Sequence, residues 1–332
     1  MGFLKRLILL LLLAAAAGIG SLAWFATQPL TLRSSPLEFS IPQGVGLSAA
    51  SRLMAEQGID FFPLAFTLLG RSLGRSTGIK AGSYEVSQGI TAWQLLEKLT
   101  RGDVTQGELV LVDGRSFRQL RAALDGNPDL RHDSAALSEK ELLARLGIAA
   151  PYAEGLFFPD TYLFAKQSSD LDVLRRAHQA LERHLAQEWE GRATGLPYAG
   201  PYEALIMASI VEKETGAPAD RAKIASVFVN RLRSGMLLQT DPTVIYGMGE
   251  RFDGNLRRDD LHTDTPWNTY TRGGLPPSPI AMPGLASLRA ALHPAATDHL
   301  YFVARGDGSS EFSRTLDEHN RAVARFLKRK GF

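Results

Sequence analysis

The longest apolar run of the chain lies near its N-terminus. No charged residue occurs from Leu7 to Leu32, and the core of this run, Leu7 to Ala26, has the length of about 20 residues that a bilayer-spanning helix requires. Small residues after the leucines would also fit a cleaved signal peptide. However, the apolar run continues to Trp24 and Phe25, and tryptophan suits a membrane interface. We therefore expect an uncleaved transmembrane helix over residues 7–27.

Basic residues flank this run unequally. Lys5 and Arg6 precede it, and the next basic residue is Arg33. The positive-inside rule then keeps residues 1–6 in the cytoplasm. The rest of the chain would lie on the outer, periplasmic side of a bacterial inner membrane.

The segment after the apolar run alternates short strand and helix patterns. Period-two and period-3.6 spacing of apolar residues, together with Thr91 as a helix cap, predicts the order strand, helix, helix, strand, helix. The predicted elements cover residues 37–44, 47–58, 61–73, 82–86 and 92–99. With a short linker, they form a small α+β region over residues 28–105.

The remainder of the chain predicts a larger α+β domain. Residues 106–150 form a connecting segment with a strand over 107–114, a helix capped by Ser116 and a polar stretch, and the larger domain covers 151–332. Its pattern predicts helices over 170–190, 201–215, 219–233 and 316–330, strands over 300–304 and 311–315, and a long loop over 237–283. A loop of that length in a compact domain is usually functional.

Two acids follow an eight-residue stretch without charge, Ala204–Val211. A carboxyl group set against an apolar wall has a raised pKa and can hold the proton that a general acid needs. Glu212 and Glu214 are two positions apart, which turns them about 200° from each other on a helix, so they cannot both face one cleft. Either could be the functional acid, or a structural carboxylate paired with Lys213 or Arg221.

Further polar side chains fall in the predicted loop and in an aromatic segment. Amide, carboxylate and phenol groups on rigid loops suit recognition of an N-acetylated sugar. The candidates are Gln239, Asp241, Tyr246, Asn268, Tyr270 and, within PYAEGLFFPDTYLF, Glu154. Alternatively, the loop groups form only a hydrogen-bonded scaffold, Asp241 only caps a turn, and Glu154 only borders the core.

Composition excludes several classes of function. A net charge of +2 from 37 basic and 35 acidic residues offers no basic stripe for nucleic acid. The absence of cysteine excludes disulfides and thiolate zinc sites, and the seven histidines are scattered without an HExxH motif. No P-loop, GxGxxG or GxSxG motif occurs. We expect neither a metal nor a cofactor.

Several long motifs occur in one order: EGLFFPDTY, IVEKET, LQTDPTVIYG, NTYTRGGLPPSPI and HPAATDHLYFV. Together they resemble the endolytic murein transglycosylase family of bacterial inner membranes. The resemblance covers essentially the whole chain, and it makes residues 28–105 similar to a LysM-type peptidoglycan-binding subdomain.

The resemblance implies a lytic cut between N-acetylmuramic acid and N-acetylglucosamine that leaves a 1,6-anhydromuramyl end and limits strand length. One carboxyl group suffices as acid and then base. The family's catalytic glutamate falls on Glu212, and the six other candidates would bind substrate or orient Glu212. Peptidoglycan synthases of the elongation or division machinery are the implied partners.

Two rival functions belong to other classes. A membrane-anchored peptidoglycan-binding scaffold would use Glu212 only structurally. A pyridoxal-phosphate lyase would need a Schiff-base lysine in a cofactor fold, which the anchor and LysM-like region disfavour.

Overall fold

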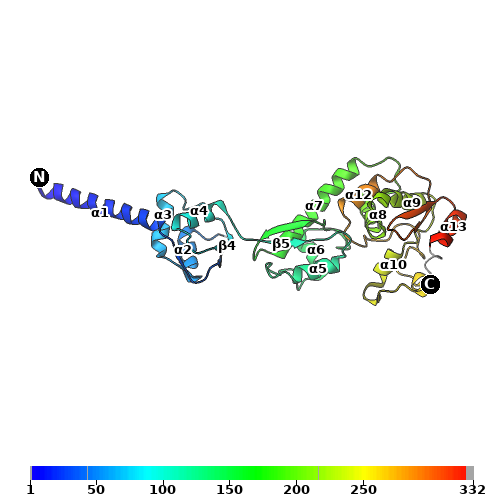
Figure 1. Cartoon of the computed structure of the whole chain (residues 1–332), viewed down its shortest axis with the longest axis horizontal. Coiled ribbons are helices and arrows are strands. Elements are labelled where there is room, and N and C mark those ends of the chain that lie inside the picture. Colours follow the sequence, from blue (N-terminus) through cyan, green and yellow to red (C-terminus); the bar gives the residue numbers. More distant parts are fainter. Residues whose placement is uncertain (1, 43, 216, 327–332) are drawn as a thin grey trace. The chain divides into compact units, whose positions relative to one another are not determined.

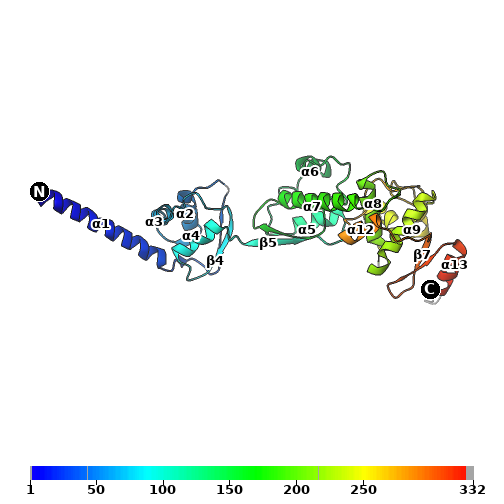
Figure 2. The ribbon, with the colours of Figure 1, turned by 90° about the horizontal axis from the view of Figure 1, so that it is seen from above.

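A computed structural model describes residues 2–42, 44–215 and 217–326 (Figures 1 and 2). The chain divides into two compact units. The first comprises residues 1–108, 129–131 and 163–168, and the second comprises 109–128, 132–162 and 169–332. The mixture of helices and short strands confirms the predicted α+β class.

The first unit begins with α1 (Gly2–Thr27), which is long and apolar enough to cross a bilayer. The following elements are β1 (Thr31–Leu32), β2 (Leu37–Ile41), α2 (Leu47–Glu56), β3 (Ile59–Asp60), α3 (Pro63–Ser72), β4 (Gly82–Val86) and α4 (Ala92–Arg101). β2 pairs antiparallel with β4, with Leu37 opposite Val86 and Ile41 opposite Gly82. β1 pairs antiparallel with β3. The predicted order of strand, helix, helix, strand and helix is confirmed, and the two-residue strands β1 and β3 add to it.

Apolar and polar residues alternate along β2, so one face of this strand is buried. Leu37, Phe39 and Ile41 are buried, whereas the residues between them are exposed. The capping box predicted at Thr91 is present, since its side chain accepts from the Gln94 N–H and the Gln94 side chain accepts from the Thr91 N–H. These elements share one core with the last turns of α1, where Ala26 is buried.

The connecting segments hold β5 (Gln106–Val110), α5 (Phe117–Asp125), α6 (Glu139–Leu146) and β6 (Thr161–Ala165), and β5 pairs with β6. Ser116 caps α5 as predicted. The strand β6 was not predicted. Its residues alternate between exposed and buried, but the aromatic residues around them suit a core edge or a sugar site equally well.

The second unit continues with α7 (Asp170–Glu190), α8 (Pro201–Glu214), α9 (Arg221–Arg233), α10 (Asp241–Met248), α11 (Arg258–His262), α12 (Leu285–Leu292), β7 (Tyr301–Ala304), β8 (Ser310–Ser313) and α13 (Leu316–Phe326). Two single-turn 3₁₀ helices lie at Pro218–Asp220 and Gly249–Arg251. The antiparallel hairpin β7–β8 has Tyr301 opposite Ser313. The end of the helix predicted over 316–330 lies outside the described residues.

One part of the sequence prediction was wrong. Residues 237–283 were expected to form a loop, but they contain α10 and α11. Pro242 stands in the first turn of α10, where a missing N–H costs no hydrogen bond, so the Asp-Pro pair begins a helix. Thr240 is the residue at its N-cap position.

The uncharged stretch in α8 forms the centre of the second core. All residues from Ala204 to Val211 are buried, and α8 packs against α12, α9 and α7 (Figure 1). Because every side of this stretch is covered, charged side chains can only follow at its end. This arrangement places Glu212 and Glu214 at the C-terminal end of α8, directly after its buried part.

Candidate active site

Glu212 lies in the last turn of α8 and is partly exposed. Its Oε2 accepts a hydrogen bond of 3.0 Å from the N–H of Gly284, the N-cap residue of α12. The positive end of the α12 dipole therefore faces the carboxylate. Within the described part of the chain, Oε1 has no hydrogen-bond partner, so this oxygen is available to a ligand.

A second acid that the sequence analysis did not single out lies beside Glu212. Burial raises the pKa of Asp113, the negative charge of Glu212 raises it further, and the positive charge of Arg221 opposes both. A Cβ built on Gly284 would lie 2.4 Å from Asp113 Oδ2, so the Asp113 carboxylate rests against the same glycine that holds Glu212. Glu212 and Asp113 thus form a pair of neighbouring acids.

Backbone contacts hold the turn that carries Asp113. Gly114 N–H donates to the carbonyl of Met282 at 2.8 Å, and Met282 N–H donates to the carbonyl of Arg115 at 2.8 Å. The Lys213 ammonium also donates to the Gly114 carbonyl, at 3.3 Å. This turn is therefore fixed to both the α8 end and the segment that leads into α12.

Glu214 lies in a separate environment, as the 200° rotation predicts. Its carboxylate accepts a hydrogen bond from the Thr240 hydroxyl. Burial raises its pKa, the hydrogen bond from Thr240 opposes the increase, and the nearby negative charge of Asp241 adds to it. The expectation of a raised pKa against an apolar wall is thus confirmed for Glu214.

A cavity of about 380 Å³ borders Glu214 and collects three of the sequence candidates, Gln239, Asp241 and Tyr270. The Tyr270 hydroxyl donates to Asp241 Oδ1 at 2.5 Å. Gln239 has a positive φ of 51°, and its Oε1 accepts from Arg231 at 3.3 Å. These polar groups gather around Glu214 rather than around Glu212.

Glu154 is buried and forms a third acidic environment. Its carboxylate accepts the N–H of Phe117, the first residue of α5, at 2.9 and 3.1 Å. Burial raises the pKa of Glu154 to about 7, although hydrogen bonds from Phe117, Tyr246 and Gly155 oppose the increase. Tyr246, predicted as a sugar ligand, forms a side-chain hydrogen bond with this buried acid.

Two further aromatic side chains extend from Tyr246 in a chain of ring contacts. Trp267 contacts Tyr246 edge-on at 5.4 Å between ring centroids, and Tyr152 contacts Trp267 at 5.8 Å. The indole N–H of Trp267 donates to the Ser278 hydroxyl at 2.9 Å. The aromatic cluster is therefore held in a fixed geometry.

Asn268 is fully buried and holds its own loop. Its amide donates to the carbonyls of Leu261 and Thr263, and its Oδ1 accepts the N–H of Tyr270. All of these bonds are internal, which fits the scaffold alternative for this residue. Across residues 2–42, 44–215 and 217–326, no three His, Asp or Glu side chains gather in a way that could hold a metal ion.

A partly exposed acid at the end of a buried helix, with a neighbouring carboxyl group, suits an enzyme that cleaves glycosidic bonds by acid catalysis. The model of the YceG-like family matches residues 39–325, so the chain belongs to this family. It is accordingly an enzyme of the lytic transglycosylase type, a lyase, as its relatives are named.

Named relatives and a solved structure agree with this membership. The chain is 32% identical to the endolytic murein transglycosylase of Bacillus subtilis over 89% of its own length and 86% of that protein. It is 26% identical to the endolytic murein transglycosylase of Streptococcus pneumoniae strain D39, covering 87% of this chain but 58% of that longer protein. A crystal structure of a yceG-like protein from Listeria monocytogenes matches with a TM-score of 0.55 and 29% identity, over 87% of this chain and 99% of that one.

Proposed function

We propose that this enzyme cuts nascent peptidoglycan strands internally, between N-acetylmuramic acid and N-acetylglucosamine, and leaves a 1,6-anhydromuramyl end. The cut would limit strand length. The proposal depends on the hydrogen bonding of Glu212. One of its carboxylate oxygens accepts the N–H of Gly284, and the other oxygen has no hydrogen-bond partner among the described residues. Family membership and the names of the relatives support the same reaction.

In the proposed mechanism, Glu212 acts twice. Its carboxyl proton passes to the glycosidic oxygen as the bond from that oxygen to C1 of the muramyl residue breaks. The muramyl 6-hydroxyl oxygen then bonds to C1 and returns its proton to the Glu212 carboxylate. The acid is regenerated, no water is consumed, and a single enzymic carboxyl group balances the reaction.

Glu212 is a better candidate than Glu214 on structural grounds. The Thr240 hydroxyl occupies the Glu214 carboxylate, which is largely buried beside Asp241. Among the described residues, Glu212 accepts a hydrogen bond only from the backbone N–H of Gly284, and its side chain is partly exposed. We therefore assign Glu214, with Gln239, Asp241 and Tyr270, to positioning the cleft or binding more distant sugars.

Asp113 gives a specific reason to consider hydrolysis as the second candidate function. Two neighbouring carboxyl groups are the usual equipment of glycoside hydrolases, in which the second group activates water or attacks C1. The product would then carry a reducing end instead of an anhydro end. We favour the lytic reaction because the relatives are named as transglycosylases.

Mass spectrometry of products from purified, uncross-linked glycan strands tests both reactions. The full-length wild type should release fragments whose muramyl ends are one water lighter than hydrolysis products. Glu212→Gln should reduce the rate about 10²- to 10⁴-fold, the usual contribution of general acid–base catalysis. Glu214→Gln serves as the matched control on the same helix turn and should retain anhydro products.

The other outcomes discriminate among the alternatives. Reducing ends would favour the hydrolase. Strand binding without any product, unchanged in Glu212→Gln, would favour the non-catalytic scaffold. Full activity of Glu212→Gln with an inactive Glu214→Gln would exchange the roles of the two acids.

The remaining proposals concern location and partners. We propose that α1 anchors the enzyme in the inner membrane with its N-terminus in the cytoplasm, and that residues 28–105 bind peptidoglycan as a LysM-like region. Anchoring would concentrate the enzyme at newly made strands. Peptidoglycan synthases are the proposed partners, and cross-linking from the full chain in cells would test this.

A further inference from the structure

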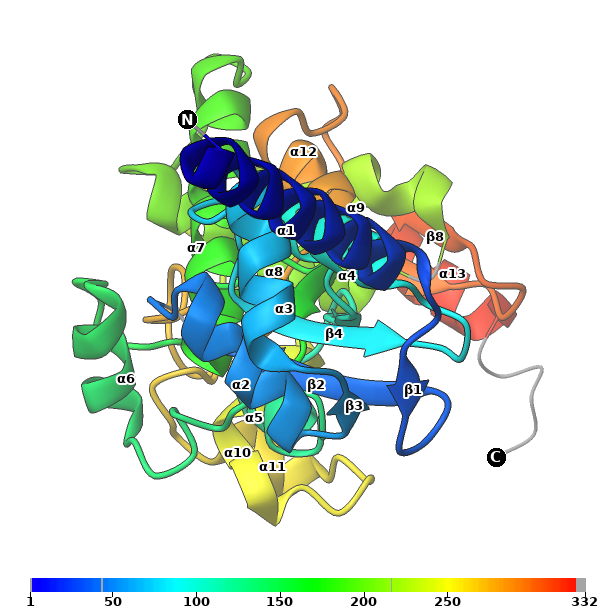
Figure 3. The ribbon, with the colours of Figure 1, turned by 90° about the vertical axis from the view of Figure 1, so that its left-hand side faces the viewer.

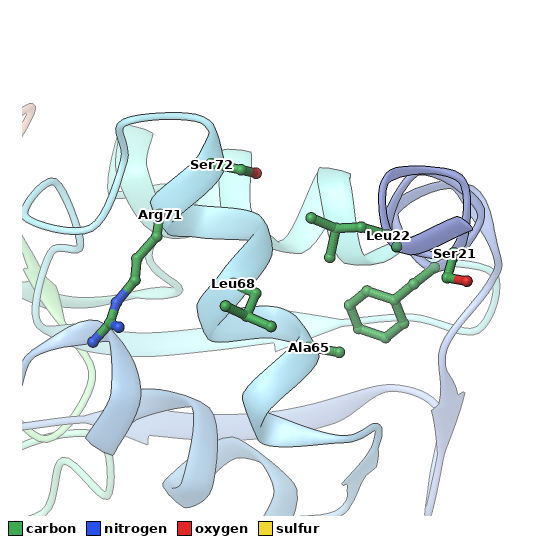
Figure 4. Close-up of a pocket in the computed structure, with 8 residues that line it drawn as sticks. Ser21, Leu22, Ala65, Leu68, Arg71 and Ser72 are labelled. Carbon is green, nitrogen blue, oxygen red and sulfur yellow. The ribbon is translucent and has the colours of Figure 1, made fainter. Parts of the chain in front are cut away.

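An apolar groove lies between α1 and α3 within the first unit (Figure 4). Its volume is about 670 Å³. The lining residues are Gly18, Ser21, Leu22 and Phe25 of α1 and Ala65, Leu68, Arg71 and Ser72 of α3. Leu22 and Phe25 also pack against the core of the unit, so the end of α1 belongs to the folded unit.

The outer side of α3 carries large apolar residues in its first two turns. Phe66 and Leu69 are buried in the core, and Gly70 lies so close to Leu47 of α2 that a Cβ would meet it at 2.5 Å. On the outside, the exposed fractions of Phe62, Leu64 and Leu68 are 68%, 57% and 47%. A water-facing helix normally presents polar residues on that side.

The length of α1 determines the depth at which this groove would lie in a membrane. Residues 7–17, the part of the predicted span that precedes the groove, rise by about 16 Å at about 1.5 Å per residue. The hydrocarbon layer of a bilayer is about 30 Å thick. If α1 spans the membrane, the hydrocarbon layer must therefore extend to the level of Gly18 and the residues that follow it. The groove and the outer side of α3 would then contact lipid.

The rim of this surface carries the side chains expected at a headgroup layer. Trp93, at the start of α4, is 41% exposed, and the Arg75 guanidinium lies 5.6 Å from its ring centroid. Arg71 borders the groove, and α3 contains no acidic residue. Tryptophan favours the membrane interface, and arginine can extend its guanidinium toward lipid phosphates. Figure 3, seen from the N-terminal side, shows α1 crossing in front of α3.

We infer that α3 lies in the bilayer interface on the side opposite the N-terminus, and that the groove between α1 and α3 holds a phospholipid acyl chain. This inference rests on the proposed anchoring by α1. The folded unit would then be fixed on the bilayer surface by two contacts, a spanning helix and an interfacial one.

Fluorescence quenching in nanodiscs tests the position of α3. The chain has no cysteine, so single substitutions can be labelled cleanly in the full-length protein. An environment-sensitive dye would be attached after Leu64→Cys or Leu68→Cys, in discs of phosphatidylcholine and phosphatidylglycerol. Leu316→Cys is the matched control, because this leucine of α13 is 54% exposed in the second unit. Leu13→Cys reports on the span itself.

Labels at 64 and 68 should show blue-shifted emission and lose fluorescence to nitroxide-labelled lipids, whereas the label at 316 should respond only to aqueous iodide. If the label at 13 is quenched by lipid nitroxide but those at 64 and 68 respond only to iodide, the inference is overturned and the anchor stands. If the label at 13 is not quenched by lipid nitroxide, the anchoring proposal and this inference both fail.

Native mass spectrometry of protein released from the same discs tests the acyl-chain site. The wild type should retain a bound phospholipid, and Ala65→Trp, which fills the groove, should lose it. Ala49→Trp is the control on α2, outside the groove, and should retain the lipid. Equal retention by all three proteins would overturn the assignment of the groove to an acyl chain.

Discussion

At the scale of single residues, the site depends on how three acids differ in their surroundings. Glu212 is held by one backbone N–H, Asp113 rests against the same glycine, and Glu154 is buried behind the start of α5. Carboxyl groups can therefore perform different tasks in one protein, because their burial and their neighbouring charges differ from one acid to the next.

Asp113→Asn tests whether the second acid contributes to the reaction. Removing its charge while keeping its size should lower turnover roughly tenfold, equivalent to about 1.4 kcal/mol in the barrier. It should also change the pH profile, because the pKa of Asp113 depends on the charge of Glu212. Steady-state rates on glycan strands from pH 4 to pH 9 would measure both effects, with Asp113→Glu as the charge-conserving variant. Rates and pH profiles identical to wild type would exclude a role for Asp113.

Glu154 predicts a pH-dependent stability. Burial raises its pKa in the folded chain to about 7, so the folded state binds this proton more tightly than the unfolded state does. The stabilisation from this proton is complete below the unfolded pKa of about 4.5 and is lost as pH rises through about 7, a change of about 3 kcal/mol. Denaturant unfolding at pH 5 and pH 8 should show that Glu154→Gln removes this loss.

Glu85→Gln is the control for that experiment, because Glu85 is exposed on β4. It should leave the pH dependence of wild type unchanged. A Glu154→Gln variant that loses as much stability between pH 5 and pH 8 as wild type would contradict the assignment.

At the scale of elements, the start of α12 connects the two acids of the pair. Gly284 has φ −76° and ψ 168°, values open to any residue, so glycine is required there by space and not by conformation. The space is taken by the Asp113 carboxylate, 2.4 Å from the position of a Cβ.

Gly284→Ala should therefore displace Asp113 without unfolding the helix. We expect turnover to fall about as much as in Asp113→Asn, and the double variant to lose little more, since neighbouring changes are not additive. The free energy of unfolding should change by about 1 kcal/mol or less. Gly46→Ala is a matched control, because Gly46 is the N-cap residue of α2 with nearly the same backbone angles and open space around its Cα.

Much of the fold could be predicted, because the residues that mark the ends of a helix or strand lie within a few positions of one another in the sequence. α7 begins and ends as expected, and the caps at Thr91 and Ser116 follow from residues three positions apart. The opposite directions of Glu212 and Glu214 follow from helix geometry alone. In contrast, α10 was missed because an Asp-Pro pair can begin either a turn or a helix.

The assembly of the site could be predicted only in part. Asp113 lies about one hundred positions before Glu212 in the chain, and nothing in the local pattern of VLVDG marks it as the neighbour of an acid. Likewise, the pairing of Tyr246 with Glu154 joins segments far apart in sequence. Such proximities arise from tertiary packing, which one sequence does not reveal.

At the scale of the whole molecule, each unit has a separate hydrophobic core. Leu96 is fully buried in the core of the first unit, and Met207 is fully buried in the core around α8. Separate cores predict that the full chain does not unfold in a single two-state transition.

Scanning calorimetry of the full chain in detergent should show two heat-unfolding transitions. Leu96→Ala should lower the midpoint temperature of one transition, and Met207→Ala that of the other. Each substitution should reduce the free energy of unfolding of its own unit by about 2–5 kcal/mol. A single transition that both substitutions lower equally would mean that the two cores unfold together.

The division into units also affects how genes for this protein can be cut. Residues 129–131 and 163–168 belong to the first unit although most of their neighbours in sequence belong to the second. No contiguous gene fragment can therefore encode the first unit without also encoding part of the second. A fragment that ends at residue 108 would lack two pieces of its own unit, whereas a circularly permuted or split gene could be designed to supply them.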